Sequence, residues 1–126
     1  MTESTTPTRV VHALLDNLFF AAKLNAAAAQ TGLRSSTART LEKALAQARA
    51  ELPVLIVLDL DAQACRPFEF IRALKADETL RAIPLLGFVA HVNIGVQEQA
   101  RQAGCDRVLA RSVFSRELPA LLKGAL

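Results

Sequence analysis

Short apolar runs and longer segments with one apolar face alternate along the whole chain. The apolar runs, which have the length of strands, occupy residues 9–15, 33–36, 54–58, 84–89 and 107–110. Segments with helical spacing follow each of them, at 19–31, 41–52, 67–75, 95–103 and 117–126. The helical pattern is clearest at 41–52, where one face is apolar and the other carries charged and amide side chains. Five strand–helix units in succession predict an α/β protein.

The segment 54–58 indicates how the strands are arranged. It contains five consecutive apolar residues, and Asp59 follows them directly. A strand without polar alternation is typical of a parallel sheet that helices cover on both faces. Parallel strands joined by helices require right-handed crossovers. We therefore predict a flavodoxin-like three-layer α/β/α sandwich, with a five-stranded parallel sheet of order 2-1-3-4-5.

Such a sheet places its functional cleft at the carboxyl ends of the strands, beside the point where the strand order reverses. Asp59 comes first among the candidates, because a carboxylate closing a buried strand is costly unless it is paired or used. Its position fits equally well a carboxylate that only caps a turn. The other residues predicted to line the cleft follow the first, third and fourth strands: Leu14, Leu15, Asp16, Asp61, Val89 and His91.

Composition narrows the possible functions. The 126 residues suit one domain, and 52% apolar residues with 21% charged residues supply a core and exclude a disordered chain. The net charge of +3 comes from dispersed basic residues, so no nucleic-acid partner is expected. No membrane partner is expected either, and we predict a cytoplasmic protein. Cys65 and Cys105 lie far apart without a CxxC motif, which predicts free thiols. We expect a disordered leader at 1–8 and a single domain at 9–126.

Four segments together resemble the receiver domain of bacterial two-component response regulators. Residues 53–60 resemble the third strand of that family, which ends in a phospho-accepting aspartate, and Asp59 stands in that place. Residues 83–91 resemble the fourth strand with its switch loop, and 103–106 resemble the turn before the fifth strand. Arg111 stands where the family has a lysine that holds the phosphoryl group. The resemblance runs from about residue 9 to 125 and implies phosphorelay signalling with Asp59 as the candidate phospho-acceptor.

The departures from the family pattern change this expectation. Aligned from Arg9, the acidic pair that binds Mg²⁺ in the family falls on Leu14 and Leu15, and a shift of one residue would bring in only Asp16. The switch Ser or Thr falls on Val89. The aromatic residue of the fifth strand is Val108, and Arg111 is the candidate cation at the phosphate site. Phosphoryl transfer depends on positioning and charge neutralisation, much of it from the metal. We therefore predict a pseudo-receiver that retains the fold and has lost the phosphorelay.

The predicted function is a stand-alone, non-enzymatic signalling module that acts by protein–protein interaction, with a kinase or an effector as partner. A homodimer is a further possibility, and no cofactor is expected. The first alternative is a genuine response regulator that is phosphorylated on Asp59 and uses Mg²⁺. The second alternative is a small-ligand-binding or enzymatic domain of flavodoxin-like type. Neither a GxGxxG motif nor a P-loop supports nucleotide binding.

Two further features of the sequence lead to hypotheses. A weak candidate for a cation site is formed by the carboxylates of Asp16, Asp59 and Asp61. The preferred interpretation is that Asp16 caps the first helix and that Asp61 points to water. An ion pair between Arg111 and Asp59 would replace the metal. Apolar side chains suggest contact with a partner at two places. One is the start of the first helix, and the other is the surface formed by the fourth and fifth strand–helix units. We assign to this interaction surface Phe19, Val108, Phe114 and Leu118.

Overall fold

The computed structural model describes residues 9–124, so the predicted leader at 1–8 lies outside the described residues. The strands are β1 (Val10–Leu14), β2 (Arg34–Ala38), β3 (Leu55–Asp59), β4 (Leu85–Val89) and β5 (Arg107–Ala110). The α-helices are α1 (Leu18–Gln30), α2 (Leu41–Ala50), α3 (Pro67–Lys75), α4 (Ile94–Ala103) and α5 (Arg111–Gly124). One turn of 3₁₀-helix, η1 (Gln63–Cys65), follows β3.

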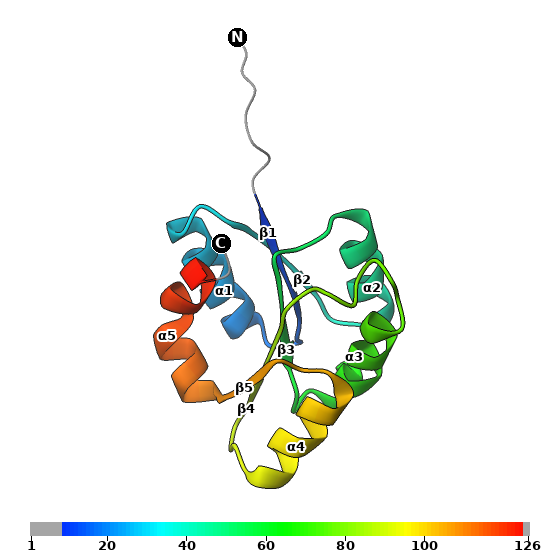
Figure 1. Ribbon diagram of the computed structural model, residues 1–126. Helices are drawn as coiled ribbons and strands as arrows, with labels where there is room; N and C mark the ends of the chain where they lie inside the picture. Colours follow the sequence, from blue (N-terminus) through cyan, green and yellow to red (C-terminus); the bar gives the residue numbers. More distant parts are fainter. Residues whose placement is uncertain (1–8, 125–126) are drawn as a thin grey trace.

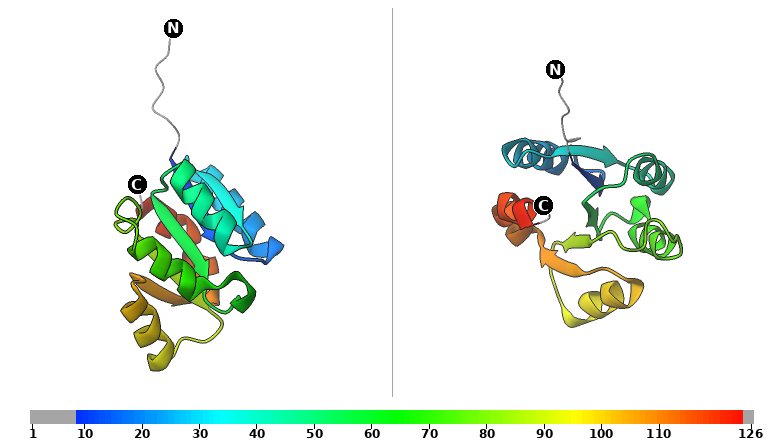
Figure 2. Two further views of the ribbon diagram at one scale, coloured as in Figure 1. Left: turned by 90° about the vertical axis from the view of Figure 1, so that its right-hand side faces the viewer. Right: turned by 45° about the horizontal axis from the view of Figure 1, so that its top comes forward.

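The strands form one parallel sheet of order β2-β1-β3-β4-β5, which confirms the predicted topology. Helices α1 and α5 cover one face of the sheet, and α2, α3 and α4 cover the other (Figures 1 and 2). Every residue of β1, β3 and β4 is buried, whereas the edge strands β2 and β5 are partly exposed. The apolar runs of β3 and β4 follow from this double cover.

Side chains alternate between two apolar cores, one on each face of the sheet. Leu14, Ile56 and Leu58 pack toward α2 and α3, whereas Val11 and Val57 pack toward α1 and α5. The second core contains an aromatic row, in which the ring of Phe88 lies between those of Phe20 and Phe114. The ring centroids of Phe88 and Phe114 are 4.6 Å apart and nearly parallel, and those of Phe20 and Phe88 are 5.5 Å apart.

The last helix begins at Arg111, six residues earlier than the predicted start at residue 117, and this changes the expected interaction surface. In the longer helix Phe114 and Leu118 face the sheet and are only 1% and 2% exposed. The prediction that these two side chains contact a partner is therefore wrong, because both belong to the core. Val108 is half-buried and packs against the core on the other face of the sheet, the face that α2, α3 and α4 cover.

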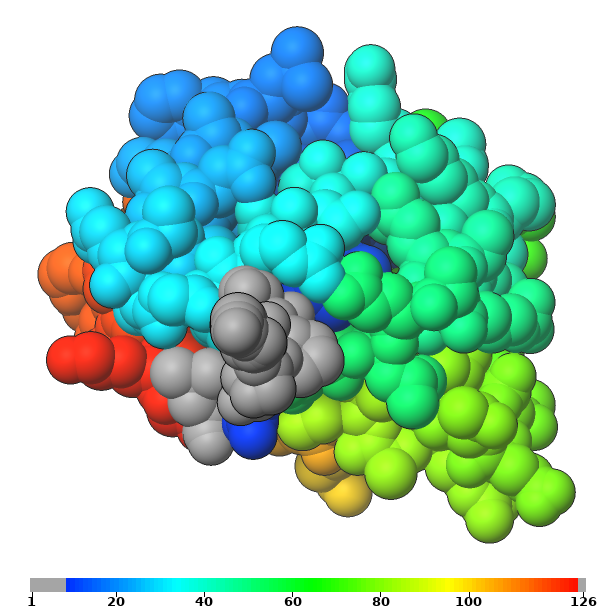
Figure 3. All heavy atoms as spheres, turned by 90° about the horizontal axis from the view of Figure 1, so that it is seen from above, coloured from blue at the N-terminus to red at the C-terminus, as the bar shows by residue number. Residues whose placement is uncertain are grey.

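The two ends of the sheet differ in what surrounds them. Figure 3 looks onto the amino-terminal end, where the α1–β2 connection (cyan) and the α2–β3 connection (green) form part of the surface. The carboxyl ends of the strands lie at the opposite end, together with the first turns of α1, α4 and α5 (Figure 1). That end carries the candidate site. Within residues 9–124 no helix is long and apolar enough to cross a membrane.

Candidate functional site at the carboxyl ends of the strands

Asp59 is the last residue of β3, and the sheet fixes its position. It lies beside Phe88 in the register of β3 and β4, and it is 6% exposed. Its Oδ1 accepts a hydrogen bond of 3.0 Å from the backbone N–H of Asp61, and its carbonyl oxygen accepts one of 3.2 Å from the N–H of Ala62. These bonds turn the chain sharply after the strand, so Asp61 returns to the same edge of the sheet.

The surroundings of Asp59 disfavour its ionised form. Burial raises the pKa of this carboxyl above its ordinary value, and the nearby carboxylates of Asp61 and Asp16 act in the same direction. The hydrogen bond from the Asp61 N–H and the charge of Arg111 lower the pKa without cancelling the effect of burial. A buried carboxyl with a raised pKa at the end of a central strand is a common feature of functional sites.

Asp61 connects three elements across the edge of the sheet. Its Oδ2 accepts a hydrogen bond of 2.7 Å from the backbone N–H of Ala90, directly after β4. The same oxygen lies 3.6 Å from a guanidinium nitrogen of Arg111, at the start of α5. The expectation that Asp61 only points to water is therefore wrong, although nearly half of its side chain remains exposed.

Arg111 lies near Asp59 but forms its ion pair with Asp61. Its guanidinium is 5.5 Å from the ring centroid of Phe20, a distance at which a cation is attracted to an aromatic face. Its Nε is buried and has no hydrogen-bond partner among residues 9–124. The hypothesis of an Arg111–Asp59 ion pair is therefore wrong. Arg111 pairs with Asp61, and its charge acts on Asp59 without forming an ion pair.

The end of β1 is apolar where the receiver resemblance places two carboxylates. Leu14 and Leu15 are 0% and 2% exposed, and they belong to the two different cores. The exposed Asp16 does not cap α1. The cap is Asn17, whose Oδ1 accepts hydrogen bonds from the N–H groups of Phe19 and Phe20 at 2.8 and 3.3 Å.

This arrangement does not fit a divalent cation such as Mg²⁺. Two hydrocarbon side chains, Leu14 and Leu15, take the places of oxygen ligands, and a hard cation binds through oxygen. One oxygen each of Asp59 and Asp61 is already hydrogen-bonded. Within the described part of the chain, no group of three or more His, Cys, Asp or Glu side chains is placed to hold a metal ion, so the weak candidacy of Asp16, Asp59 and Asp61 finds no support.

The remaining predicted cleft residues follow β4. Val89 is 3% exposed and packs in the core between the sheet and α2 to α4, so its side chain does not face an incoming group. His91 is exposed in the connection to α4. A hollow beside Asp61 and Val89 is lined further by side chains of η1, α3 and α4.

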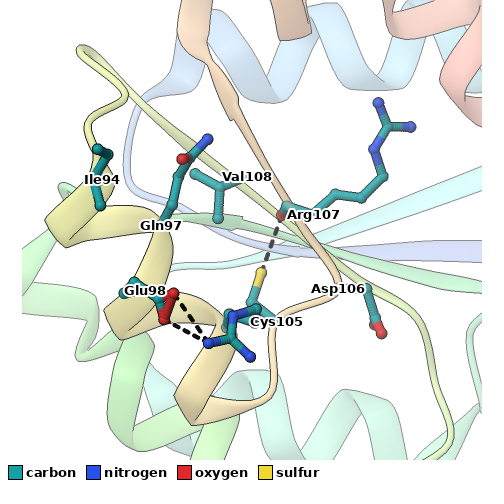
Figure 4. A pocket seen from close by; sticks show the side chains of 8 residues that line it. Ile94, Gln97, Glu98, Cys105, Asp106, Arg107 and Val108 are labelled. Atoms are coloured by element: carbon teal, nitrogen blue, oxygen red, sulfur yellow. Dashed lines mark hydrogen bonds and ion pairs between the residues drawn. The ribbon is translucent and has the colours of Figure 1, made fainter.

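A second hollow lies between α4 and β5 (Figure 4). Its polar rim includes the ion pair of Glu98 and Arg101, and Ile94 at its edge is 80% exposed. Cys105 lies at the base, where its Sγ is 3.1 Å from the carbonyl oxygen of Arg107. Burial raises the pKa of this thiol, which keeps it protonated and unreactive. Val108 borders the hollow.

Sequence reasoning located Asp59 and the correct edge of the sheet but missed the contacts of Asp61 and Ala90. The spacing Asp59-Leu60-Asp61 carried part of the signal, because an Asp side chain commonly accepts the backbone N–H two residues on and so turns the chain. The hydrogen bond that Asp61 accepts from the Ala90 N–H could not be predicted, because no residue type marks a backbone donor.

A parallel sheet of order 2-1-3-4-5 with a buried aspartate at the end of β3 is the arrangement expected of the receiver class, and a sequence relative supports this class. No family model matches the chain. The polar-differentiation response regulator DivK of Brucella ovis is 31% identical over 83 residues, which are 66% of this chain and 68% of the relative. DivK of Brucella anthropi is 30% identical over the same length. The chain belongs to the family of response regulator receiver domains.

Solved structures support the fold. The chemotaxis response regulator CheY4 of Vibrio cholerae superposes with a TM-score of 0.83 at 19% identity, covering 95% of this chain and 100% of the other. A response regulator of Hahella chejuensis gives a TM-score of 0.86 at 20% identity, covering 94% and 96%. At these identities the likeness concerns the fold and says nothing of which switch residues each protein has retained.

Proposed function

We propose that this chain is a receiver module that signals through protein–protein contact and does not depend on phosphorylation of Asp59. The observation that carries the proposal is the burial of Leu14 and Leu15 at the end of β1. Phosphoryl transfer to a carboxylate requires cationic charge against the transferred group, which a metal ion usually supplies. With no acidic side chain at either position, the pair that would recruit this charge is missing, and the exposed Asp16 is the carboxylate that follows Leu15.

The other residues around Asp59 support the same proposal. Val89 cannot donate a hydrogen bond to a phosphoryl oxygen, and its side chain is buried. Arg111 is a cation whose charge acts on Asp59, and its guanidinium is engaged by Asp61.

An exposed apolar pair at the start of α1 supports contact with another protein. Leu18 and Phe19 are 72% and 65% exposed and lie beside the carboxyl edge of the sheet. The Lys23 ammonium lies 5.3 Å from the Phe19 ring centroid, so the patch has a cationic border. We propose this patch as the contact for a kinase or an effector in the cytoplasm. The α4–β5 hollow with Val108 is the candidate contact for a homodimer.

One observation favours a second candidate function. Asp59 occupies the end of β3, and the relatives from Brucella are named as response regulators. In this alternative Asp59 accepts a phosphoryl group slowly, with Arg111 as the neighbouring cation.

Intact-mass measurement separates the two functions. Wild-type protein and an Asp59→Asn control are incubated with acetyl phosphate and Mg²⁺, beside a response regulator of established activity. The proposal expects no phosphoryl mass gain on the wild-type chain, whereas a gain that Asp59→Asn abolishes would establish the alternative.

A binding experiment tests the interaction itself. Tagged wild-type protein is used to capture partners, and candidates are confirmed with purified components. We expect Asp59→Asn to bind the same partner as the wild type. Phe19→Ala should weaken binding, whereas Leu52→Ala, which truncates an exposed leucine at the amino-terminal end of the sheet, should not. Equal binding by Phe19→Ala and Leu52→Ala would remove the α1 patch from the proposal.

A further inference from the structure

The contacts of Asp61 bring two anion-binding donors together on one oxygen atom. Its Oδ2 receives the backbone N–H of Ala90 at 2.7 Å and faces the guanidinium of Arg111 at 3.6 Å. A backbone N–H and an arginine side chain are donors that proteins commonly direct at bound oxyanions. They come from the ends of different elements, β4 and α5, and they meet beside Asp59 because the turn after β3 brings Asp61 back to this edge.

An oxyanion placed at this edge would need the same two donors. The place is open to solvent, with nearly half of the Asp61 side chain exposed, so an external anion could reach these donors and bind through charge and hydrogen bonds. The buried Nε of Arg111 has no partner among residues 9–124, so Asp61 uses only part of the donor capacity of this guanidinium. A tetrahedral oxyanion presents more oxygen atoms than the single Oδ2 that contacts these donors now.

We propose that the Asp61 carboxylate is an internal anion that occupies an oxyanion-binding site formed by the Ala90 N–H and the Arg111 guanidinium. The site accepts an external oxyanion of phosphate size only when this carboxylate is absent. The inference rests on the proposed function and deepens it, since it explains what replaces the phosphoryl group. A negative charge is built into the edge where phosphorylation would add one, so the ends of β3, β4 and α5 are held together without modification.

The hydrogen bond to Ala90 distinguishes this arrangement from an ordinary surface ion pair. An exposed pair such as that of Arg111 and Asp61, viewed alone, contributes little to stability. The Ala90 N–H donates to a charged acceptor at 2.7 Å, and such bonds are about twice as strong as neutral ones. Occupation of the site is therefore best measured at the Ala90 amide.

The test is a titration with inorganic phosphate, followed by ¹H–¹⁵N NMR at the Ala90 amide and the Arg111 Nε–H. Chloride keeps the ionic strength constant, and no phosphodonor or Mg²⁺ is added. The proteins are the wild type, Asp61→Ala, Asp61→Asn, the pair Asp61→Ala with Arg111→Gln, and Glu78→Gln. Glu78 is exposed on the connection between α3 and β4, so Glu78→Gln is the control for losing one negative charge.

We expect Asp61→Ala to bind phosphate with saturable shifts at both signals, at least about tenfold more tightly than the wild type. Glu78→Gln should behave like the wild type, and Arg111→Gln should abolish the binding gained by Asp61→Ala. Asp61→Asn removes the charge but keeps an oxygen that can still accept the Ala90 N–H, so it should bind phosphate more tightly than the wild type and less tightly than Asp61→Ala. It tests the inference even if Asp61→Ala folds poorly.

Three results would overturn the inference: equal phosphate binding by the wild type and the Asp61 variants, no binding by either Asp61 variant, or binding that survives Arg111→Gln. Failure of the proposed function appears separately, as a phosphoryl mass gain at Asp59 of the wild type. The phosphate titration contains no phosphodonor, so covalent modification cannot change its outcome.

Discussion

Replacing Asp59 by Asn should stabilise the protein at neutral pH. The folded-state pKa of Asp59 is raised above its ordinary value of 3.8, mainly by burial, so the folded state binds this proton more tightly than the unfolded state. The stabilisation from proton binding is present below the unfolded-state pKa and is lost as the pH rises through the folded-state pKa. At pH 7 the wild type therefore retains a destabilising buried charge, facing Asp16, Asp61 and Arg111, that Asp59→Asn removes.

The expected gain is modest, because Asn retains the shape of Asp and its Oδ1 can still accept the N–H of Asp61. Substitutions that relieve strain of this kind commonly stabilise by about 1 kcal/mol. For a domain of this size, such a gain raises Tm by roughly 4 °C. The exposed charge removed by Glu78→Gln should change stability by less than about 0.5 kcal/mol.

Urea denaturation of these proteins at a series of pH values checks the prediction. The difference between Asp59→Asn and the wild type should be largest at neutral pH. It should shrink as the pH falls through the folded-state pKa and vanish near the unfolded-state pKa. The reasoning is refuted if Asp59→Asn is no more stable than the wild type at pH 7, or if its advantage grows toward acid pH.

Three further predictions concern stability and are measured by urea denaturation. Asn17→Ala removes the cap of α1 and should cost about 1 kcal/mol; an unchanged midpoint would contradict the capping assignment. Phe114→Ala should cost about 3–5 kcal/mol, because this ring is buried against Phe88. Phe19→Ala, which truncates an exposed ring, should cost less than about 0.5 kcal/mol. Similar losses in the two variants would count against the observed position of α5. Gly87→Ala should cost about 1–3 kcal/mol, since a Cβ there would lie 2.7 Å from Leu60; a neutral effect would mean that Leu60 moves aside freely.

The order of the elements could be predicted because the central strands are buried on both faces. The apolar run that ends at Asp59 carries this information in residue type alone, and the predicted strands and helices lie within a few residues of those observed except at α5. The start of α5 was missed because residues 111–116 mix basic, hydroxyl and β-branched side chains, and because no connecting turn separates this helix from β5. Asp16 and Asn17 are both good capping residues, and only the backbone path decides between them.

The candidate site was predictable in position and only partly in its contacts. Parallel strands bring their carboxyl ends to one edge, so Asp59, Asp61 and Arg111 were expected near one another. Which carboxylate pairs with Arg111 depends on a turn held by the backbone N–H of Asp61 and on a second backbone N–H, that of Ala90. Every residue except proline has such a group, so the sequence does not indicate which one a carboxylate will bind.

The apolar residues at the end of β1 and the carboxylate of Asp61 are physically connected features of this receiver. Leu14 and Leu15 pack into cores on opposite faces of the sheet, so an acidic side chain at either position would lose apolar contacts and bury a charge. The edge around Asp59 therefore cannot regain a metal-binding pair by a small local change. In that setting an added phosphoryl group would meet Arg111 without a metal and would compete with Asp61 for it. An internal carboxylate needs no phosphodonor and no divalent cation, and its position is fixed by folding. Under the proposed function, the apolar residues at the end of β1 thus favour a switch held in one state, whose output depends on which partner binds.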